Sequence, residues 1–170
     1  IPLSAAFAAK EHGDARKALD ILRNAGELAK DADAETVTEE HVRDAREQAD
    51  IDRFSQLLEG QPVQAKATVY ALSVLDQQEE KDEFSTREIH EVYQQVTSAL
   101  GMDALSQRRM SDKLSEQTFL DILGRTDRKG RGYGRGVSHS YYLLEDPDVV
   151  QTVILQDSFF GDLAGTSVSE

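Results

Sequence analysis

The stretch Arg125–Leu144 reads RTDRKGRGYGRGVSHSYYLL, and it decides the fold of the second half of the chain. At its centre, residues 128–136 contain four cations and four glycines, whereas the whole chain carries a net charge of -13. Arg125–Lys129 predicts a short strand, and the β-forming run Val137–Leu144 predicts a second one. The glycines between them allow the chain to reverse tightly. The stretch therefore predicts a β-hairpin with a basic connection.

The residues before this hairpin predict three successive helices. A long helix is expected over Val63–Gln78, and the capping box Ser85–Glu88 predicts the start of the next one. The third helix is expected to begin at Ser106 and to continue to Leu123, with Gly124 as its C′ residue. Gln117 interrupts its inward face, where an apolar residue is expected. Three helices followed by a β-hairpin are typical of a winged helix.

The first third of the chain also predicts helices. One apolar face at helical spacing is formed by Ala15, Ala18, Leu19, Leu22, Ala25, Gly26 and Ala29. Thr38 is expected to cap a helix over 39–48, and a separate short helix is expected over 51–58. The Gly/Pro break at Glu59–Pro62 predicts a domain boundary, which gives expected domains of 1–60 and 61–170.

The end of the chain predicts one more helix. Glu145–Pro147 is expected to end the second hairpin strand, and Val149–Leu155 predicts a closing helix. The last dozen residues are mostly small or polar, and we expect them to be frayed. At the other end, Ile1 runs directly into a helical pattern, so we expect the chain to be part of a longer protein.

Composition limits the class of protein. A chain of 170 residues with 39% hydrophobic residues can bury a core as one domain or as two small ones. No apolar run approaches the ~20 residues that span a bilayer, and no signal-peptide pattern occurs. The absence of cysteine fits an intracellular protein. We therefore expect no membrane partner and a cytoplasmic location.

The acidic charge is unevenly distributed. Residues 124–139 contain five cations and one carboxylate, whereas 1–56, 57–123 and 140–170 are each acidic. A basic segment is the electrostatic feature that a nucleic-acid backbone attracts. Adaptation to very high salt is one hypothesis for the acidic excess, and ordinary acidic solubility is the alternative.

The predicted third helix opens with side chains suited to DNA. In a winged helix this helix enters the major groove, and its N-terminal residues meet base edges or phosphates. The candidate DNA-binding residues here are Ser106, Gln107, Arg108, Arg109 and Lys113. Gln and Arg supply bidentate donors, and the helix N-terminus supplies N–H groups. Under the alternative interpretation, the two arginines form a solvated face paired to Asp112.

The hairpin supplies the other candidates. They are Arg125, Arg128, Lys129, Arg131, Tyr133 and Arg135. Arginines between glycines can enter a narrow minor groove or bind phosphates. A disordered Arg-Gly tail that binds RNA is the competing interpretation, but it predicts no strand afterwards, and the run Tyr141–Leu144 argues against it.

No catalytic site is visible in the sequence. Neither the phosphate-binding loop G-x-x-x-x-G-K-[ST] nor a G-x-S-x-G elbow occurs. The carboxylates are too numerous and dispersed to nominate a catalytic pair. The histidines show no metal-ligand spacing, and we interpret them as structural or surface residues; they are His12, His41, His90 and His139. We therefore expect this chain to have no enzymatic activity of its own.

Three stretches resemble one protein family. His12–Ala29, HGDARKALDILRNAGELA, resembles the sensor-2 helix of an AAA+ ATPase lid. Val37–Val42 is similar to the start of the next lid helix, and Leu105–Glu116, LSQRRMSDKLSE, resembles a winged-helix recognition helix. Together they resemble the archaeal replication initiators related to origin recognition complex subunit 1 and cell division control protein 6. The resemblance covers nearly the full chain, in the same order.

The resemblance implies a mainly α fold, with a helical AAA+ lid followed by a winged helix. It implies an ATP-dependent initiator that binds duplex origin DNA and helps to load the replicative helicase, with other initiator copies as further partners. Arg16 matches the arginine that points at the γ-phosphate of ATP. ATP or ADP with Mg is expected for the full-length parent, and no cofactor is expected in this chain.

Two departures from the family pattern stand out. The Walker A, Walker B and sensor-1 parts are missing, so we expect no ATP hydrolysis by this chain. The family's first wing strand is expected to open on an apolar residue, whereas Arg125–Asp127 is polar. The remaining alternative is a winged helix that docks the helicase or another initiator and has little direct contact with DNA.

Overall fold

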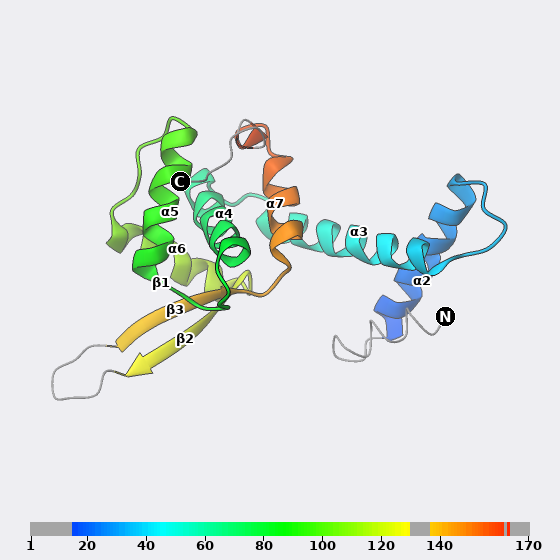
Figure 1. The fold of residues 1–170 in the computed structure, drawn as a ribbon, viewed down its shortest axis with the longest axis horizontal. Coiled ribbons are helices and arrows are strands. Elements are labelled where there is room, and N and C mark those ends of the chain that lie inside the picture. Colours follow the sequence, from blue (N-terminus) through cyan, green and yellow to red (C-terminus); the bar gives the residue numbers. More distant parts are fainter. Residues whose placement is uncertain (1–14, 130–136, 162, 164–170) are drawn as a thin grey trace. The chain divides into compact units, whose positions relative to one another are not determined.

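The computed structural model describes residues 15–129, 137–161 and 163 (Figure 1). The chain forms two compact units, Ile1–Arg53 and Phe54–Glu170, and the boundary between them lies within a helix. The described residues are mainly helical, with one three-stranded sheet in the second unit. The predicted fold class is therefore confirmed.

The first unit pairs two helices, α2 (Ala15–Asp31) and the larger part of α3 (Glu39–Leu58). Its buried cluster joins Ile21 and Ala25 of α2 to Val42 and Ala45 of α3. Thr38 Oγ1 accepts the backbone N–H of His41 at 3.3 Å, which caps α3 as predicted.

Two predictions for this unit are wrong. The expected helices over 39–48 and 51–58 form one continuous helix, because side-chain pairs four residues apart span the expected break. Gln48 Nε2 donates to Asp52 Oδ1 at 2.9 Å there. Leu19 was expected on the buried face but is 66% exposed. The buried stripe instead follows Ile21, Ala25 and Ala29, which lie one helical turn apart.

The second unit is built around α4 (Val63–Gln78), as predicted. This helix contacts α5 (Thr86–Ala99), α6 (Gln107–Phe119), α7 (Pro147–Leu155) and strand β3 (Val137–Leu143). Figure 1 shows α4 among the other helices, with the hairpin extending away from them. Every residue from Ala67 to Leu75 is buried, as expected for a helix that is covered on all sides.

The predicted starts of α5 and α6 are confirmed. Ser85 and Glu88 form the capping box of α5, and Ser106 is the N-cap of α6. Gly101 follows α5 with a φ of 66°, a conformation that favours glycine. The closing helix α7 was expected from Val149 but begins at Pro147, where the Asp146 side chain accepts the backbone N–H of Asp148.

The predicted end of α6 is wrong. The helix stops at Phe119, Asp121 adopts a φ of 55°, and strand β2 (Leu123–Lys129) begins at once. Gly124 lies inside that strand, opposite Tyr142. A Cβ at Gly124 would lie 2.1 Å from Tyr142 Cζ, so the glycine makes room for a cross-strand ring. The apolar opening of the wing strand is Leu123, which is 1% exposed.

The hairpin of β2 and β3 is antiparallel and belongs to a sheet of order β1-β3-β2. Strand β1 (Phe84–Ser85) is a two-residue strand that the sequence did not predict. It pairs Phe84 with Tyr141, so the start of α5 is attached to the hairpin. The hairpin and the closing helix are both confirmed.

Two further expectations need correction. Phe160 and Leu163 are 0% and 3% exposed, so part of the last dozen residues is packed rather than frayed. Gln117 is fully buried at the predicted inward position, and its Nε2 donates to Gln61 Oε1 at 3.1 Å. That hydrogen bond joins α6 to the segment just before α4 and satisfies the amide nitrogen, whereas Gln117 Oε1 is buried without a hydrogen-bond partner among the described residues.

None of the helices within the described ranges is long and apolar enough to cross a membrane.

Candidate nucleic-acid interface

The first turn of α6 presents the candidate side chains to solvent. Ser106 is the N-cap, and its Oγ accepts the backbone N–H of Arg109 at 3.5 Å. Gln107, Arg108 and Arg109 are all exposed. Within the described residues, the N–H groups of Gln107 and Arg108 have no acceptor. An exposed helix start with free N–H groups is suited to an anion.

The two arginines of this turn carry uncompensated charge. In the described part of the chain, neither guanidinium forms an ion pair, so the alternative pairing to Asp112 is absent. Cations are unfavourable next to the positive end of a helix. Positive potential is therefore concentrated at the first turn of α6, where a bound phosphate would neutralise it.

The rest of α6 is different in character. Lys113 forms an ion pair with Glu116 at 2.8 Å. Asp112 and Glu116 are exposed, and Phe119 is 87% exposed. The free positive charge of α6 is thus confined to its first turn.

The segment between α5 and α6, residues 102–106, is here called the α5–α6 turn. Tyr93 Oη accepts the backbone N–H of Leu105 at 3.1 Å and donates to Gln64 Oε1. Gln64 Nε2 donates to the carbonyl oxygen of Asp103 at 3.1 Å. His90 Nε2 donates to the carbonyl oxygen of Leu105 at 2.9 Å, which fixes the proton on that nitrogen.

Burial strengthens the preference of the Tyr93 hydroxyl for its protonated form. It raises the pKa of the phenol above its ordinary value of 10.0, while the Leu105 N–H bond lowers it in part. A neutral hydroxyl can donate one hydrogen bond and accept another, as it does here.

At the described part of the hairpin, the candidate cation is already paired. Arg125 Nε lies 3.1 Å from Asp127 Oδ1. The same oxygen accepts a hydrogen bond from His139 Nδ1 at 2.7 Å, since Asp127 and His139 are cross-strand partners. The His139 hydrogen bond, with a further contribution from Arg125, lowers the pKa of Asp127 below its ordinary value.

Other predicted residues are not fully described. Arg131, Tyr133 and Arg135 lie outside the described residues. Arg128 and Lys129 belong to β2, and Arg16 belongs to α2, but only the backbone of these three is described. Their roles stay predictions.

The sequence did not point to the residues that hold the α5–α6 turn or pair with Arg125. Tyr93 was not among the candidates, and His90 and His139 were interpreted as structural or surface residues. One signal was available: a tyrosine on an inward face brings a hydroxyl that needs a partner.

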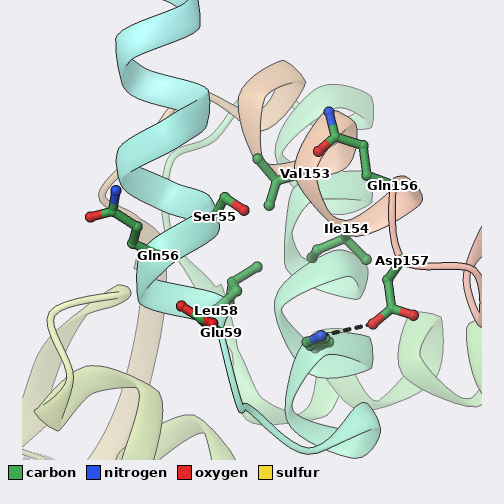
Figure 2. A pocket seen from close by; sticks show the side chains of 9 residues that line it. Ser55, Gln56, Leu58, Glu59, Val153, Ile154, Gln156 and Asp157 are labelled. Atoms are coloured by element: carbon green, nitrogen blue, oxygen red, sulfur yellow. Dashed lines mark hydrogen bonds and ion pairs between the residues drawn. The ribbon is translucent and has the colours of Figure 1, made fainter.

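An open cleft of about 450 Å³ lies elsewhere in the second unit, between the last turn of α3, α4 and α7 (Figure 2). Lys66 donates to Asp157 at 2.7 Å on its wall, and this bond lowers the pKa of Asp157. The lining residues are Ser55, Gln56, Leu58, Glu59, Lys66, Val153, Ile154, Gln156 and Asp157. The ion pair joins α4 to the segment just after α7.

The described side chains do not form a metal site. No group of three or more His, Asp or Glu residues that could hold a metal occurs among them. For a nucleotide, the sequence offers Arg16 alone and lacks the phosphate-binding loop.

Three helices, a β-hairpin and an exposed basic helix start define a winged-helix protein, here preceded by a helical unit. Residues 1–47 match the family described as Cdc6 AAA+ ATPase-type lid domain, and residues 56–153 match that described as CDC6, C terminal winged helix domain. The chain belongs to this Cdc6 family and comprises its lid and C-terminal winged helix.

Relatives in halophilic archaea are similar over most of the chain. The ORC1-type DNA replication protein 4 of Halobacterium salinarum is 49% identical over 162 residues, which cover 95% of this chain and 39% of that protein. The ORC1-type DNA replication protein 17 of Haloarcula marismortui is 42% identical over 154 residues, covering 90% and 38%. This chain thus spans about two fifths of the length of these relatives.

A solved structure is similar as well. It is that of the Aeropyrum pernix Orc1 protein in complex with DNA, with a TM-score of 0.69 and 38% sequence identity. The similarity covers 95% of this chain and 41% of the Orc1 chain. Fold and sequence therefore agree on the family.

Proposed function

We propose that this C-terminal region of an initiator binds duplex origin DNA through α6 and the hairpin. The proposal is carried by Arg108 and Arg109, which are exposed at the start of α6 and have no ion-pair partner among the described residues. The DNA complex of the similar Orc1 protein supports it. The expected DNA target is the replication origin that the full-length parent protein recognises.

In this mechanism the first turn of α6 approaches the duplex. The two guanidinium groups and the free N–H groups bind phosphates or base edges, and the basic hairpin contacts the neighbouring groove. Asp112 and Glu116, farther along α6, repel phosphate and limit how much of the helix can approach. Binding energy then comes mainly from counterion release at a few contacts.

A salt titration tests the proposal. The 170-residue chain is titrated with a fluorescein-labelled mixed-sequence duplex at increasing salt. Replacing both Arg108 and Arg109 by Ala is expected to lower affinity and to reduce the log–log salt slope by about two. Arg131→Ala with Arg135→Ala tests the hairpin in the same way. Binding that none of these changes affects would contradict DNA contact by these elements.

The control is Arg87→Ala. Arg87 is an exposed arginine of α5 that forms an ion pair with Glu91, so its removal changes net charge without touching α6. We expect its salt slope to equal that of the unmodified chain.

The lid is proposed to act only in the full-length parent. There Arg16 would sense the γ-phosphate of ATP bound with Mg, and the protein would help to load the replicative helicase together with other initiator copies. Arg16→Ala in the parent is expected to slow ATP turnover, and unchanged turnover would contradict the sensor role.

A second function is favoured by the outer end of α6. Phe119 is 87% exposed and shares an open surface with Asp112 and Glu116, which suits a protein better than a phosphate. The winged helix could then dock the helicase or another initiator. Retained pull-down of the parent organism's helicase by the variant lacking Arg108 and Arg109, together with absent DNA binding, would favour this function.

A further inference from the structure

The turn that precedes α6 belongs to no helix or strand, so its backbone lacks regular partners. Such a segment normally leaves its N–H and C=O groups to water and retains conformational freedom. Here side chains from two other helices bind it instead. Gln64 comes from the first turn of α4, and His90 and Tyr93 come from α5.

Side chains bind three backbone groups of the turn. The Asp103 carbonyl accepts from Gln64 at 3.1 Å, the Leu105 N–H donates to Tyr93 at 3.1 Å, and the Leu105 carbonyl accepts from His90 at 2.9 Å. Leu105 is held on both sides, immediately before the N-cap of α6. This arrangement fixes where the helix begins and in which direction it starts.

Tyr93 is the centre of this network. It is 0% exposed, and a buried hydroxyl is unfavourable unless it is bonded. Its ring lies 6.1 Å from that of His90 with an interplanar angle of 26°, so the two rings support each other. Because Tyr93 also donates to Gln64, one residue links α4, α5 and the turn.

A rigid turn matters for ligand binding because ordering a mobile segment on binding reduces affinity. Arg108 and Arg109 follow the turn after Gln107, and no ion pair with a described residue fixes their guanidinium groups. Their direction therefore depends on the backbone that carries them.

We infer that Tyr93 is a positioning residue for DNA binding, which acts through Arg108 and Arg109 by fixing the α5–α6 turn together with Gln64 and His90. The inference rests on the proposed function, since it concerns the orientation of the same two arginines.

A double-mutant cycle tests it on the 170-residue chain. Tyr93→Phe is measured in the unmodified background and in the variant lacking both arginines, with the labelled mixed-sequence duplex at low salt. In the unmodified background affinity is expected to fall by about three- to tenfold, the effect of losing one or two hydrogen bonds. In the variant lacking the arginines, the same change is expected to have no further effect.

A direct measurement accompanies the cycle. Amide hydrogen exchange at Leu105 is expected to accelerate in Tyr93→Phe because its acceptor is lost. Gln64→Leu is the second variant; it changes a partly exposed residue and leaves the Tyr93 ring in place. It is expected to reproduce the loss of affinity with the core intact.

Tyr70→Phe is the matched control. Tyr70 is 5% exposed and belongs to the same unit, but its ring packs against Phe160 at 6.5 Å. Its replacement is expected to leave duplex affinity and the exchange of Leu105 unchanged.

The possible outcomes distinguish failure of the inference about Tyr93 from failure of the proposed DNA-binding function. If removal of the arginines weakens binding but Tyr93→Phe does not, the inference is overturned and the proposed function stands. Equal losses from Tyr93→Phe in both backgrounds also overturn the inference, because Tyr93 would then act through general stability. If removal of the arginines has no effect, the proposed function fails and the inference fails with it.

Discussion

The α5–α6 turn precedes the candidate arginines of α6, and the base of the hairpin carries Arg125. The two regions differ in how their polar groups are paired. At the turn, the Tyr93 hydroxyl makes two hydrogen bonds, while Arg108 and Arg109 stay free. At the hairpin base, Arg125 is paired with Asp127, and the buried Tyr141 hydroxyl has no described hydrogen-bond partner. The turn is therefore ordered by its surroundings, and the helix start that follows it carries two unpaired arginines. At the hairpin base, the ion pair between Arg125 and Asp127 must break before the Arg125 guanidinium can bind a phosphate.

The two buried tyrosines give the largest expected contrast. Tyr93→Phe is expected to lower the free energy of unfolding by about 1–2 kcal/mol, because two hydrogen bonds are lost. Tyr141→Phe removes an unsatisfied buried hydroxyl and is expected to raise it by up to about 1 kcal/mol. Urea unfolding of both variants measures the difference. Equal losses would show that the two hydroxyls are equivalent and would remove this part of the contrast.

The second largest contrast is expected between the arginines of α6 and Arg125 of the hairpin, in their contribution to duplex affinity. Arg108→Ala with Arg109→Ala is expected to weaken duplex binding by about tenfold at low salt, whereas Arg125→Ala costs about twofold, because its charge is already offset by Asp127. Fluorescence anisotropy with the mixed-sequence duplex measures both. A larger loss for Arg125→Ala would move the main contact from the helix to the hairpin.

A smaller gain is expected from freeing the hairpin cation. Asp127→Asn removes the carboxylate that holds Arg125, so duplex affinity is expected to rise by about two- to threefold at low salt and by less at high salt. Glu91→Gln is the control, because it removes one exposed charge of α5 that pairs with Arg87. An equal gain in the control would indicate a general charge effect.

The smallest expected effect is on acid stability. The pKa of Asp127 is lowered, so its contribution to stability is fully present above its ordinary value of 3.8 and is lost as the pH falls through the folded value. An NMR titration of the carboxyl carbon is expected to give a midpoint below 3.8. His139→Ala is expected to raise that midpoint more than Arg125→Ala does, because the His139 bond is the larger cause. The reverse order would contradict this assignment.

The sequence predicted the features that depend on neighbouring residues. Ser85 with Glu88 and Ser106 were predicted as helix starts because capping is local chemistry. The hairpin was predicted because β-forming residues follow the glycines. Arg108 and Arg109 were candidates because the order of elements places them on a recognition-type helix.

Contacts between distant residues were not predictable in the same way. Gly124 was interpreted as a helix end because glycine adopts positive φ, whereas it accommodates the ring of Tyr142 on another strand. Tyr93 bonds to Leu105 and Gln64, which are 12 and 29 residues away in sequence. An amphipathic pattern identifies the inward face of a helix, but it does not identify the partner of a hydroxyl on that face.

The hydrogen bond between Gln117 and Gln61 has a practical consequence for transplanting this domain. Gln117 is fully buried in α6, and its partner precedes the first residue of α4. A graft trimmed to begin at Val63 would leave the Gln117 amide without an acceptor inside the core, at a cost of about 1–3 kcal/mol. The portable module therefore includes Gln61, or else it needs an apolar residue at position 117.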